Sequence, residues 1–326
     1  MKIDILKQPA ATILLAEAAL LAVGVGATIG EREVVTAATP TAEAVESLVS
    51  GSGSLFGAIV AALLVFINSL LAARIVTRYS ASVVRSFVPM VLFTIAATAT
   101  SVQTGSIIPQ LTATLLLTGS SRLIRSFKRS LIFAPLFEGY FLIGIIPLLY
   151  PNALPVVALS LLMMAIYERT PREWVAGMAG ALLPTLLCAW LWWLFAGVDF
   201  GTTLADTFGA IGGERFRLAE LFTHDRLPEG VMLAFMTQIV LLAVVSLVVM
   251  GAGMRTRPKK INWHFTLIVV GSLLMLLLDS PSPYFYALFA SGFAVIAHLF
   301  FARWPHIATL IAYLLLLILG FGAMLL

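Results

Sequence analysis

The chain has 326 residues and a net charge of +4, with 60% hydrophobic residues and only 11% Asp, Glu, Lys or Arg. Because soluble domains carry about 25% charged residues, this composition excludes a soluble enzyme and a disordered chain. The single cysteine, Cys188, excludes a disulfide framework within the chain and a cysteine-based metal site. The sequence therefore predicts an all-α, polytopic membrane protein.

Apolar runs of roughly the length needed to cross a bilayer, about 20 residues, recur along the chain. We predict eleven transmembrane helices within a single membrane domain, residues 1–326. In chain order they lie at 10–29, 55–73, 86–102, 105–121, 131–149, 153–167, 174–197, 230–252, 262–279, 284–301 and 306–325. The first run could also be a cleaved signal peptide, but its length and Glu17 favour a span that is retained.

The positions of the basic residues predict the orientation of these spans. With the N-terminus in the cytoplasm, the N-terminal segment and the loops after even-numbered spans together receive sixteen of the 20 Lys and Arg residues. Only Arg32, Arg215, Arg217 and Arg226 then lie outside. An excess of Lys and Arg in cytoplasmic loops is typical of membrane proteins. The distribution predicts a multi-pass protein of the bacterial inner membrane, with its C-terminus outside.

Two predicted outer loops are longer than simple turns. The first, 30–54, carries Glu31 and Glu33 directly after the first span. The second, 198–229, is rich in charge, and the spacing of its apolar residues between Leu204 and Leu221 indicates an interfacial helix. We expect the outer face to be acidic and partly structured, and the inner face to be basic with short loops.

Two carboxylates fall inside predicted spans, Glu17 and Glu138, each about two turns from the cytoplasmic end. Ionisable groups at membrane depth are costly and are functional candidates by default, although at this depth a carboxylate could also reach interfacial water or an arginine. The fifth and sixth spans contain several Pro and Gly residues and, at their outer junction, Asn152. This pattern indicates either broken helices around a transporter site or close helix packing.

The outer loops also hold groups suited to acid–base chemistry. Glu31 or Glu33 could act as a general base on a lipid-linked substrate, while Arg215, Arg217 or Arg226 could hold its phosphate. The alternative is a solvated anionic loop. No metal-ligand spacing, phosphate loop or dinucleotide fingerprint is present in the sequence, so we expect no metal, no cofactor and no nucleic-acid partner, and an ATP-driven pump is excluded.

Part of the chain resembles a family of uncharacterised inner-membrane proteins of the Bacteroidota. The similarity runs from Asn68 to Leu194 and rests on Arg85-Ser86-Phe87-Val88-Pro89, the stretch from Phe137 to Gly144, Leu149-Tyr150-Pro151 and Pro171-Arg172-Glu173-Trp174. That family has no established activity to carry over.

A weaker similarity is to polyprenyl-phosphate-dependent glycosyltransferases with many spans, through a basic cytoplasmic turn followed by a Gly-x-x-x-x-Gly helix and a Pro-containing outer turn. This resemblance implies a catalytic carboxylate in the first outer loop, a role that Glu31 or Glu33 would fill. The chain departs from the pattern because it lacks the usual acidic pair and a large outer domain.

Three functions are compatible with these patterns. The leading hypothesis is a glycosyltransferase-like protein that binds or transfers a lipid-linked, polyprenyl-phosphate sugar at its outer face, and whether it is an enzyme stays open. The second is a secondary transporter with a site at the broken helices around Glu138 and Asn152. The third is a non-catalytic subunit of an envelope assembly complex. In each case the lipid bilayer is the expected partner.

Overall fold

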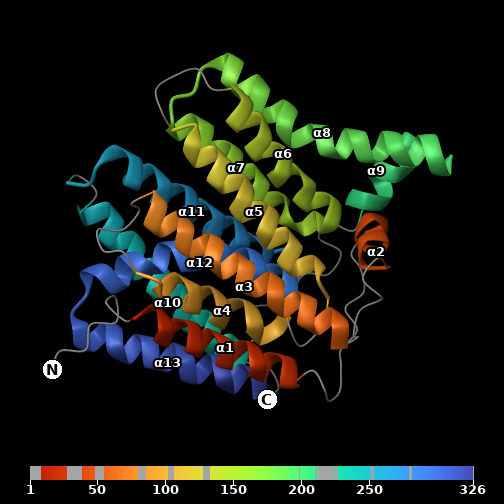
Figure 1. Ribbon diagram of the computed structural model, residues 1–326. Helices are drawn as coiled ribbons and strands as arrows, with labels where there is room; N and C mark the ends of the chain where they lie inside the picture. Colours follow the sequence, from red (N-terminus) through yellow and green to blue (C-terminus); the bar gives the residue numbers. More distant parts are fainter. Residues whose placement is uncertain are drawn as a thin grey trace.

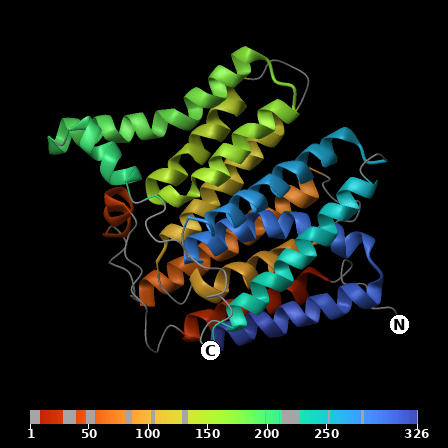
Figure 2. The same ribbon diagram turned by 180° about the vertical axis from the view of Figure 1, so that it is seen from behind.

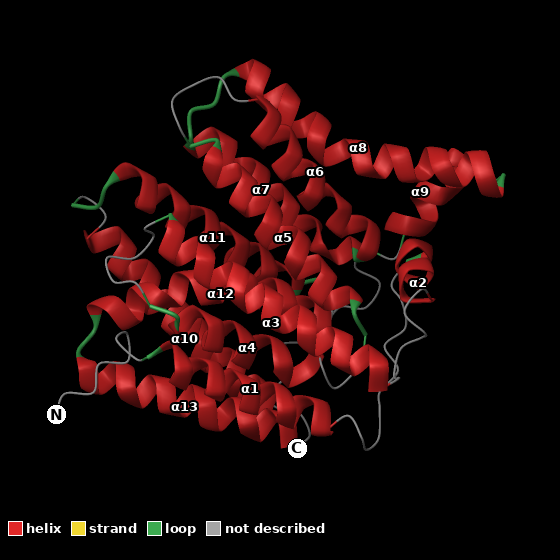
Figure 3. Ribbon diagram, viewed as in Figure 1, coloured by secondary structure: helices red, strands yellow, loops and turns green. Residues whose placement is uncertain are grey.

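The protein is a bundle of helices (Figure 1). The computed structural model describes residues 9–27, 39–47, 55–79, 86–101, 106–127, 133–197, 199–209, 211, 223, 227–250, 253–278 and 281–325. Within those residues the regular structure is entirely helical (Figure 3). The helices are α1 Ala10–Ala27, α2 Pro40–Ser47, α3 Leu55–Arg78, α4 Val88–Ser101, α5 Ile108–Arg125, α6 Phe133–Leu149, η2 Pro151–Ala153, α7 Leu154–Ile166, α8 Pro171–Ala196, α9 Phe200–Phe208, α10 Leu227–Met250, α11 Thr256–Met275, α12 Pro283–Arg303 and α13 His306–Leu325.

Each apolar range predicted to span the membrane is occupied by one helix, and α2 and α9 fall within the two predicted outer loops. Five helices are long and apolar enough to cross a bilayer, α3, α8, α10, α12 and α13, and α1, α4, α6 and α7 belong to shorter apolar stretches. The fold is therefore that of a helical membrane protein. The total of eleven spans and the positions of the two termini stay predictions.

Helix α12 is the centre of the larger part of the bundle. In its most apolar stretch, 94% of the residues are buried, and α3, α4, α5, α10, α11 and α13 all contact it. Figure 2 shows α10 and α13 on the face opposite to the one seen in Figure 1. Helix α1 lies against α3, α4 and α13. Such an all-round apolar helix is the kind that occupies a protein core.

A second group of helices, α5 to α8, packs beside this core. Helix α6 lies between α5 and α8, while α7 joins the group to α11. The contacts are close because glycines face backbone: a Cβ placed on Gly144 would lie 2.2 Å from the Ala181 carbonyl oxygen of α8, and one on Gly119 would lie 2.8 Å from the Gly139 oxygen. Small residues at such contacts let helix backbones approach each other in membranes. The glycines of α6 thus have a packing role.

The beginnings and ends of several helices follow local sequence signals. Thr170 and Glu173 form a capping box at the start of α8, and Gly197 ends that helix with a φ of 65°. Ser282 accepts a hydrogen bond from the Phe285 N–H at the start of α12. These contacts satisfy backbone groups that a helix end leaves unpaired.

One end of the bundle carries the two short helices. Helices α2 and α9 lie where α6 and α8 end and where α3 begins, on the right in Figure 1. We call this end the α2 end. The end portion of α8 leaves the bundle there and projects outward with α9 (Figures 1 and 2). Helix α9, Phe200–Phe208, covers only the beginning of the range in which an interfacial helix is expected, and residues 212–222 lie outside the described residues.

Candidate functional site

All residues of the predicted outer site lie outside the described part of the chain. These are Glu31, Glu33, Arg215, Arg217 and Arg226. Their roles as base and phosphate ligands stay predictions.

Glu138 lies on the surface of the bundle near the start of α6. Its carboxylate pairs with the Arg122 guanidinium of α5 at 3.2 Å, and the two side chains are 51% and 43% exposed. Helix α6 runs without interruption past Glu138, from Phe133 to Leu149. The carboxylate thus meets an arginine at a helix end, which is the structural alternative to a transporter site.

Asn152 lies at the α2 end, in the short helix η2 that turns the chain from α6 into α7. Nearly the whole length of α6, roughly 20 Å at the usual rise per residue, separates it from Glu138. The break between the fifth and sixth predicted spans is this turn, so the structure does not bring Glu138 and Asn152 into one site.

Contacts of two threonine hydroxyl groups fix helix α2 to α6 and α8. The Thr39 hydroxyl donates a hydrogen bond to the Leu148 carbonyl of α6, 2.6 Å away, and accepts one from the Ala42 N–H at 3.1 Å. Thr41 Oγ1 lies 3.5 Å from Cys188 Sγ of α8. These contacts hold α2 against α6 and α8.

A buried carboxylate of α2 and a buried phenol of α12 interact electrostatically at the α2 end. Glu46 is 8% exposed and Tyr284, at the start of α12, is 2% exposed, and the two are within electrostatic range of each other. Among the described residues, neither Glu46 Oε1 nor the Tyr284 hydroxyl has a hydrogen-bond partner. Buried polar atoms are rarely left unpaired, so this pair is a candidate binding site.

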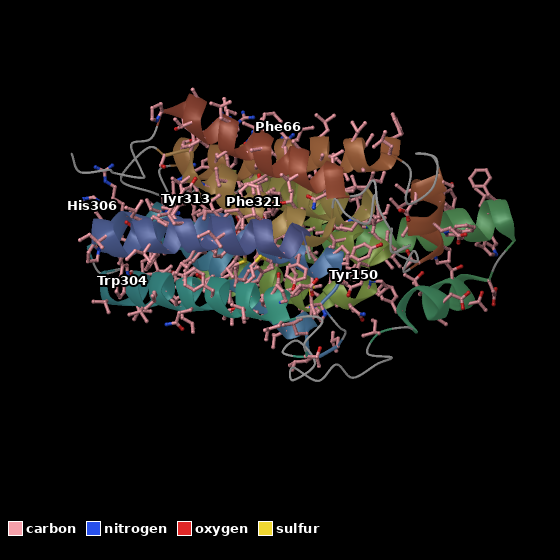
Figure 4. All side chains as sticks on the ribbon, turned by 90° about the horizontal axis from the view of Figure 1, so that it is seen from below. Phe66, Tyr150, Trp304, His306, Tyr313 and Phe321 are labelled. Carbon is pink, nitrogen blue, oxygen red and sulfur yellow. The ribbon has the colours of Figure 1, made fainter. Side chains whose placement is uncertain are left out.

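Two further side chains support the Tyr284 ring. Tyr150 stacks on it with a centroid distance of 4.5 Å and an angle of 3°, and the Ser282 hydroxyl donates to the Tyr150 hydroxyl at 3.3 Å. Figure 4 shows Tyr150 at the opposite end of the bundle from Trp304 and His306. We call Glu46, Tyr150, Ser282 and Tyr284 the α2-end cluster. It combines a carboxylate acceptor with hydroxyl groups that can donate or accept.

The sequence identified few of these residues. Glu46 could be seen only as one of several acids in the first outer loop, and Tyr150 only as part of a Tyr-Pro turn. Ser282 and Tyr284 carry no motif. They come together because α2 packs on α5 and α6 at the end of the bundle where Tyr150 stacks on Tyr284, which hydropathy alone does not reveal.

A second buried polar cluster lies in the interior, around Glu17. The residue is 0% exposed, and its Oε1 atom accepts a hydrogen bond from Thr94 of α4 at 2.9 Å. The Ser69 hydroxyl of α3 is in very short contact with the same oxygen. Oε2 has no partner among the residues that the structure describes. We call Glu17, Ser69 and Thr94 the Glu17 cluster.

A further group of buried polar side chains, centred on two amides, lies between α3 and α5. Asn68 donates to the Gln110 carbonyl of α5 at 2.9 Å, and Thr114 donates to Asn68 Oδ1 at 2.8 Å. Asn68 and Gln110 are fully buried. Together with the Glu17 cluster, these residues make the contacts among α1, α3, α4 and α5 unusually polar for an apolar bundle.

The end opposite α2 is rich in basic side chains held on aromatic rings. Lys260 lies over the Tyr167 ring at 5.2 Å and Arg257 over Tyr79 at 5.5 Å, which is cation–π geometry. Arg169 joins helices by donating to Glu173 at 3.1 Å and to the Ser126 carbonyl. No group of three or more potential metal ligands occurs among the described residues.

These features define a helical membrane protein whose described residues form buried polar clusters both at the α2 end and in the interior. No protein-family model, curated protein or solved structure matches the chain.

Proposed function

We propose that the protein binds the saccharide head group of a lipid-linked sugar at the α2 end, which the charge pattern predicts to face outward. The observation that carries this proposal is the buried pair of Glu46 and Tyr284, each with a polar atom unpaired among the described residues. A sugar matches such a pair because its hydroxyl groups can donate to a carboxylate and accept from a phenol.

The position of the pair favours a ligand attached to a lipid. Ser282 and Tyr284 lie at the beginning of α12, and Tyr150 follows the last residue of α6. Helix ends of this kind meet the membrane interface, where a head group sits while its polyprenyl chain stays among the helices and lipids. Glu46 and Tyr284 would then bind the sugar. Arg215, Arg217 or Arg226 would bind the phosphate group of the lipid.

Binding of a polyprenyl-phosphate hexose to the protein in nanodiscs, followed by native mass spectrometry, tests the proposal. Glu46→Gln and Tyr284→Phe should each weaken binding about tenfold or more, the effect of losing one hydrogen bond with a charged or buried partner. Glu43→Gln is the matched control, because Glu43 lies on the same helix but is exposed, and it should bind normally. Equal binding by all variants, or equal binding of polyprenyl phosphate without a sugar, would refute the proposal.

The transfer reaction is a separate part of the proposal, in which Glu31 or Glu33 acts as base. Sugar transfer from the polyprenyl-phosphate donor in proteoliposomes should be lost when both are replaced by Gln, while binding of the donor is retained. Transfer at the wild-type rate by that double variant would contradict catalysis by these residues and leave the binding role of Glu46 intact.

A further inference from the structure

The Glu17 cluster lies deep in the bundle, away from the α2 end. Glu17 is near the middle of α1, Thr94 near the middle of α4, and Ser69 just past the middle of α3. All three side chains are fully buried. A carboxylate at membrane depth is costly unless it is paired or neutralised, and no lysine, arginine or histidine pairs with Glu17 among the described residues.

The hydrogen bonds around Ser69 show how the carboxyl can be neutralised. Ser69 Oγ is in very short contact with Glu17 Oε1 and also lies 2.7 Å from the Phe66 carbonyl oxygen. A hydroxyl has one proton, so Ser69 cannot donate to both oxygens at once. If Glu17 is protonated, its O–H donates to Ser69, and Ser69 donates to Phe66. If Glu17 is ionised, Ser69 turns and donates to the carboxylate.

Both arrangements use the same atoms, and neither requires a helix to move. Thr94 donates to Oε1 in each, and its own carbonyl accepts from Thr98. The Phe66 carbonyl, inside α3, keeps its place in the helical ladder when Ser69 turns away. The network therefore accommodates gain or loss of one proton by rotation of a single hydroxyl.

We infer that Glu17 is a reversible proton-binding site inside the helical bundle, with Ser69 as the hydroxyl that switches between the carboxyl group and the Phe66 carbonyl. The proton comes from water at one end of the bundle, converts the carboxylate to the acid, and returns to water when it is released. This site is independent of the proposed head-group site, and it makes Glu17, not Glu138, the intramembrane carboxyl available to a proton-linked carrier.

On the elements packed against α1, no other described ionisable group faces Glu17. The elements packed against α1 are α3, α4 and α13, and their described ionisable groups are Arg74, Arg78, Tyr313 and His306. Arg74, Arg78 and His306 are exposed, and the buried Tyr313 lies against Phe301 of α12. None of them hydrogen-bonds to or ion-pairs with Glu17 in the described structure.

Labelling with dicyclohexylcarbodiimide, an apolar reagent that attacks protonated carboxyl groups, tests the inference. The whole protein in nanodiscs is labelled between pH 5 and pH 9, and the peptide that contains Glu17 is quantified by mass spectrometry. We expect labelling to fall severalfold as the pH rises, with no effect of Na⁺. Constant labelling across the range would mean a fixed, structural carboxyl group, and protection by Na⁺ at constant pH would mean a sodium site. Either result overturns the inference.

Variants separate the proton site from general destabilisation. Glu17→Gln should abolish labelling of that peptide, whereas Glu138→Gln, which removes the exposed carboxylate of α6, should leave it unchanged. Ser69→Ala removes the hydroxyl that donates to the ionised carboxylate, so labelling should persist to higher pH. If Ser69→Ala elutes as a folded protein and its pH profile is unchanged, the switching role of Ser69 is refuted without dependence on the Glu17 variant.

Discussion

Arg169 shows how a single residue can join elements far apart in the sequence. It follows α7, precedes α8, and reaches both Glu173 and the Ser126 carbonyl at the end of α5. The Arg169 and Glu173 side chains are buried, at 9% and 5% exposure. Removing one partner of a buried ion pair leaves the other charge uncompensated, which is more damaging than removing both.

We expect Arg169→Met to reduce the free energy of unfolding by about 3–5 kcal/mol. The neighbouring exposed Arg172 provides the control, since Arg172→Met should change stability by less than about 0.5 kcal/mol. Unfolding in detergent, followed by circular dichroism, measures both. The double variant Arg169→Met/Glu173→Met should be more stable than Arg169→Met alone, and a double variant that is less stable would contradict the interpretation of a buried pair.

Some of the residues that make buried polar contacts could be identified from the sequence, and others could not. Pro171-Arg172-Glu173-Trp174 is recognisable as a turn, and Glu173 indeed forms a capping box with Thr170. Glu17 stands out from its position inside an apolar run. Its partners Ser69 and Thr94 do not, because serine and threonine are common in spans and only the packing of α1 on α3 and α4 shows which ones meet.

At the scale of elements, α6 and α8 are the two helices whose backbones approach each other most closely at glycine residues. Gly144 faces the Ala181 carbonyl, and Gly180 of α8 faces the Phe137 carbonyl oxygen, which a Cβ placed on Gly180 would approach to 2.6 Å. The two helices therefore touch backbone to backbone at two levels. Helix pairs of this kind leave no space for a larger side chain.

Gly144→Ala should lower the free energy of unfolding by about 1–3 kcal/mol, because the added methyl group forces α6 and α8 apart. Gly26→Ala in α1 is the matched control, since a Cβ there meets no atom within 4 Å, and it should be neutral or slightly stabilising. Chemical unfolding in the same detergent compares the two. Equal stability of both variants would mean that α6 and α8 are packed less closely than these distances indicate.

The positions of the long helices could be predicted from the sequence, because an apolar run of sufficient length has few alternatives to a helix in a membrane. The pairing of helices could not. The Gly and Pro residues of α6 indicated either a broken helix or close packing. That choice depended on Ala181 of α8 and Gly119 of α5, which belong to other parts of the chain and carry no signal of their own.

At the scale of the whole molecule, the orientation in the membrane is open to a direct experiment. In a Cys188→Ser background, Gly201→Cys places a thiol on α9 at the α2 end, and Arg172→Cys places one at the start of α8. With the α2 end outside, as the basic residues predict, a membrane-impermeant maleimide should label the first variant in intact cells and the second only after permeabilisation. The reverse result would invert the orientation.

The central position of α12 also has a consequence for biosynthesis. This helix begins at Pro283. The ribosome therefore synthesises α3, α4, α5, α10 and α11 before it synthesises α12, the helix that all five contact. Until α12 is inserted, these helices lie in the bilayer without the helix at the centre of their core. Contacts between other helices, such as α5 with α6 and α6 with α8, can already form. Assembly of this core therefore waits until α12 has been synthesised.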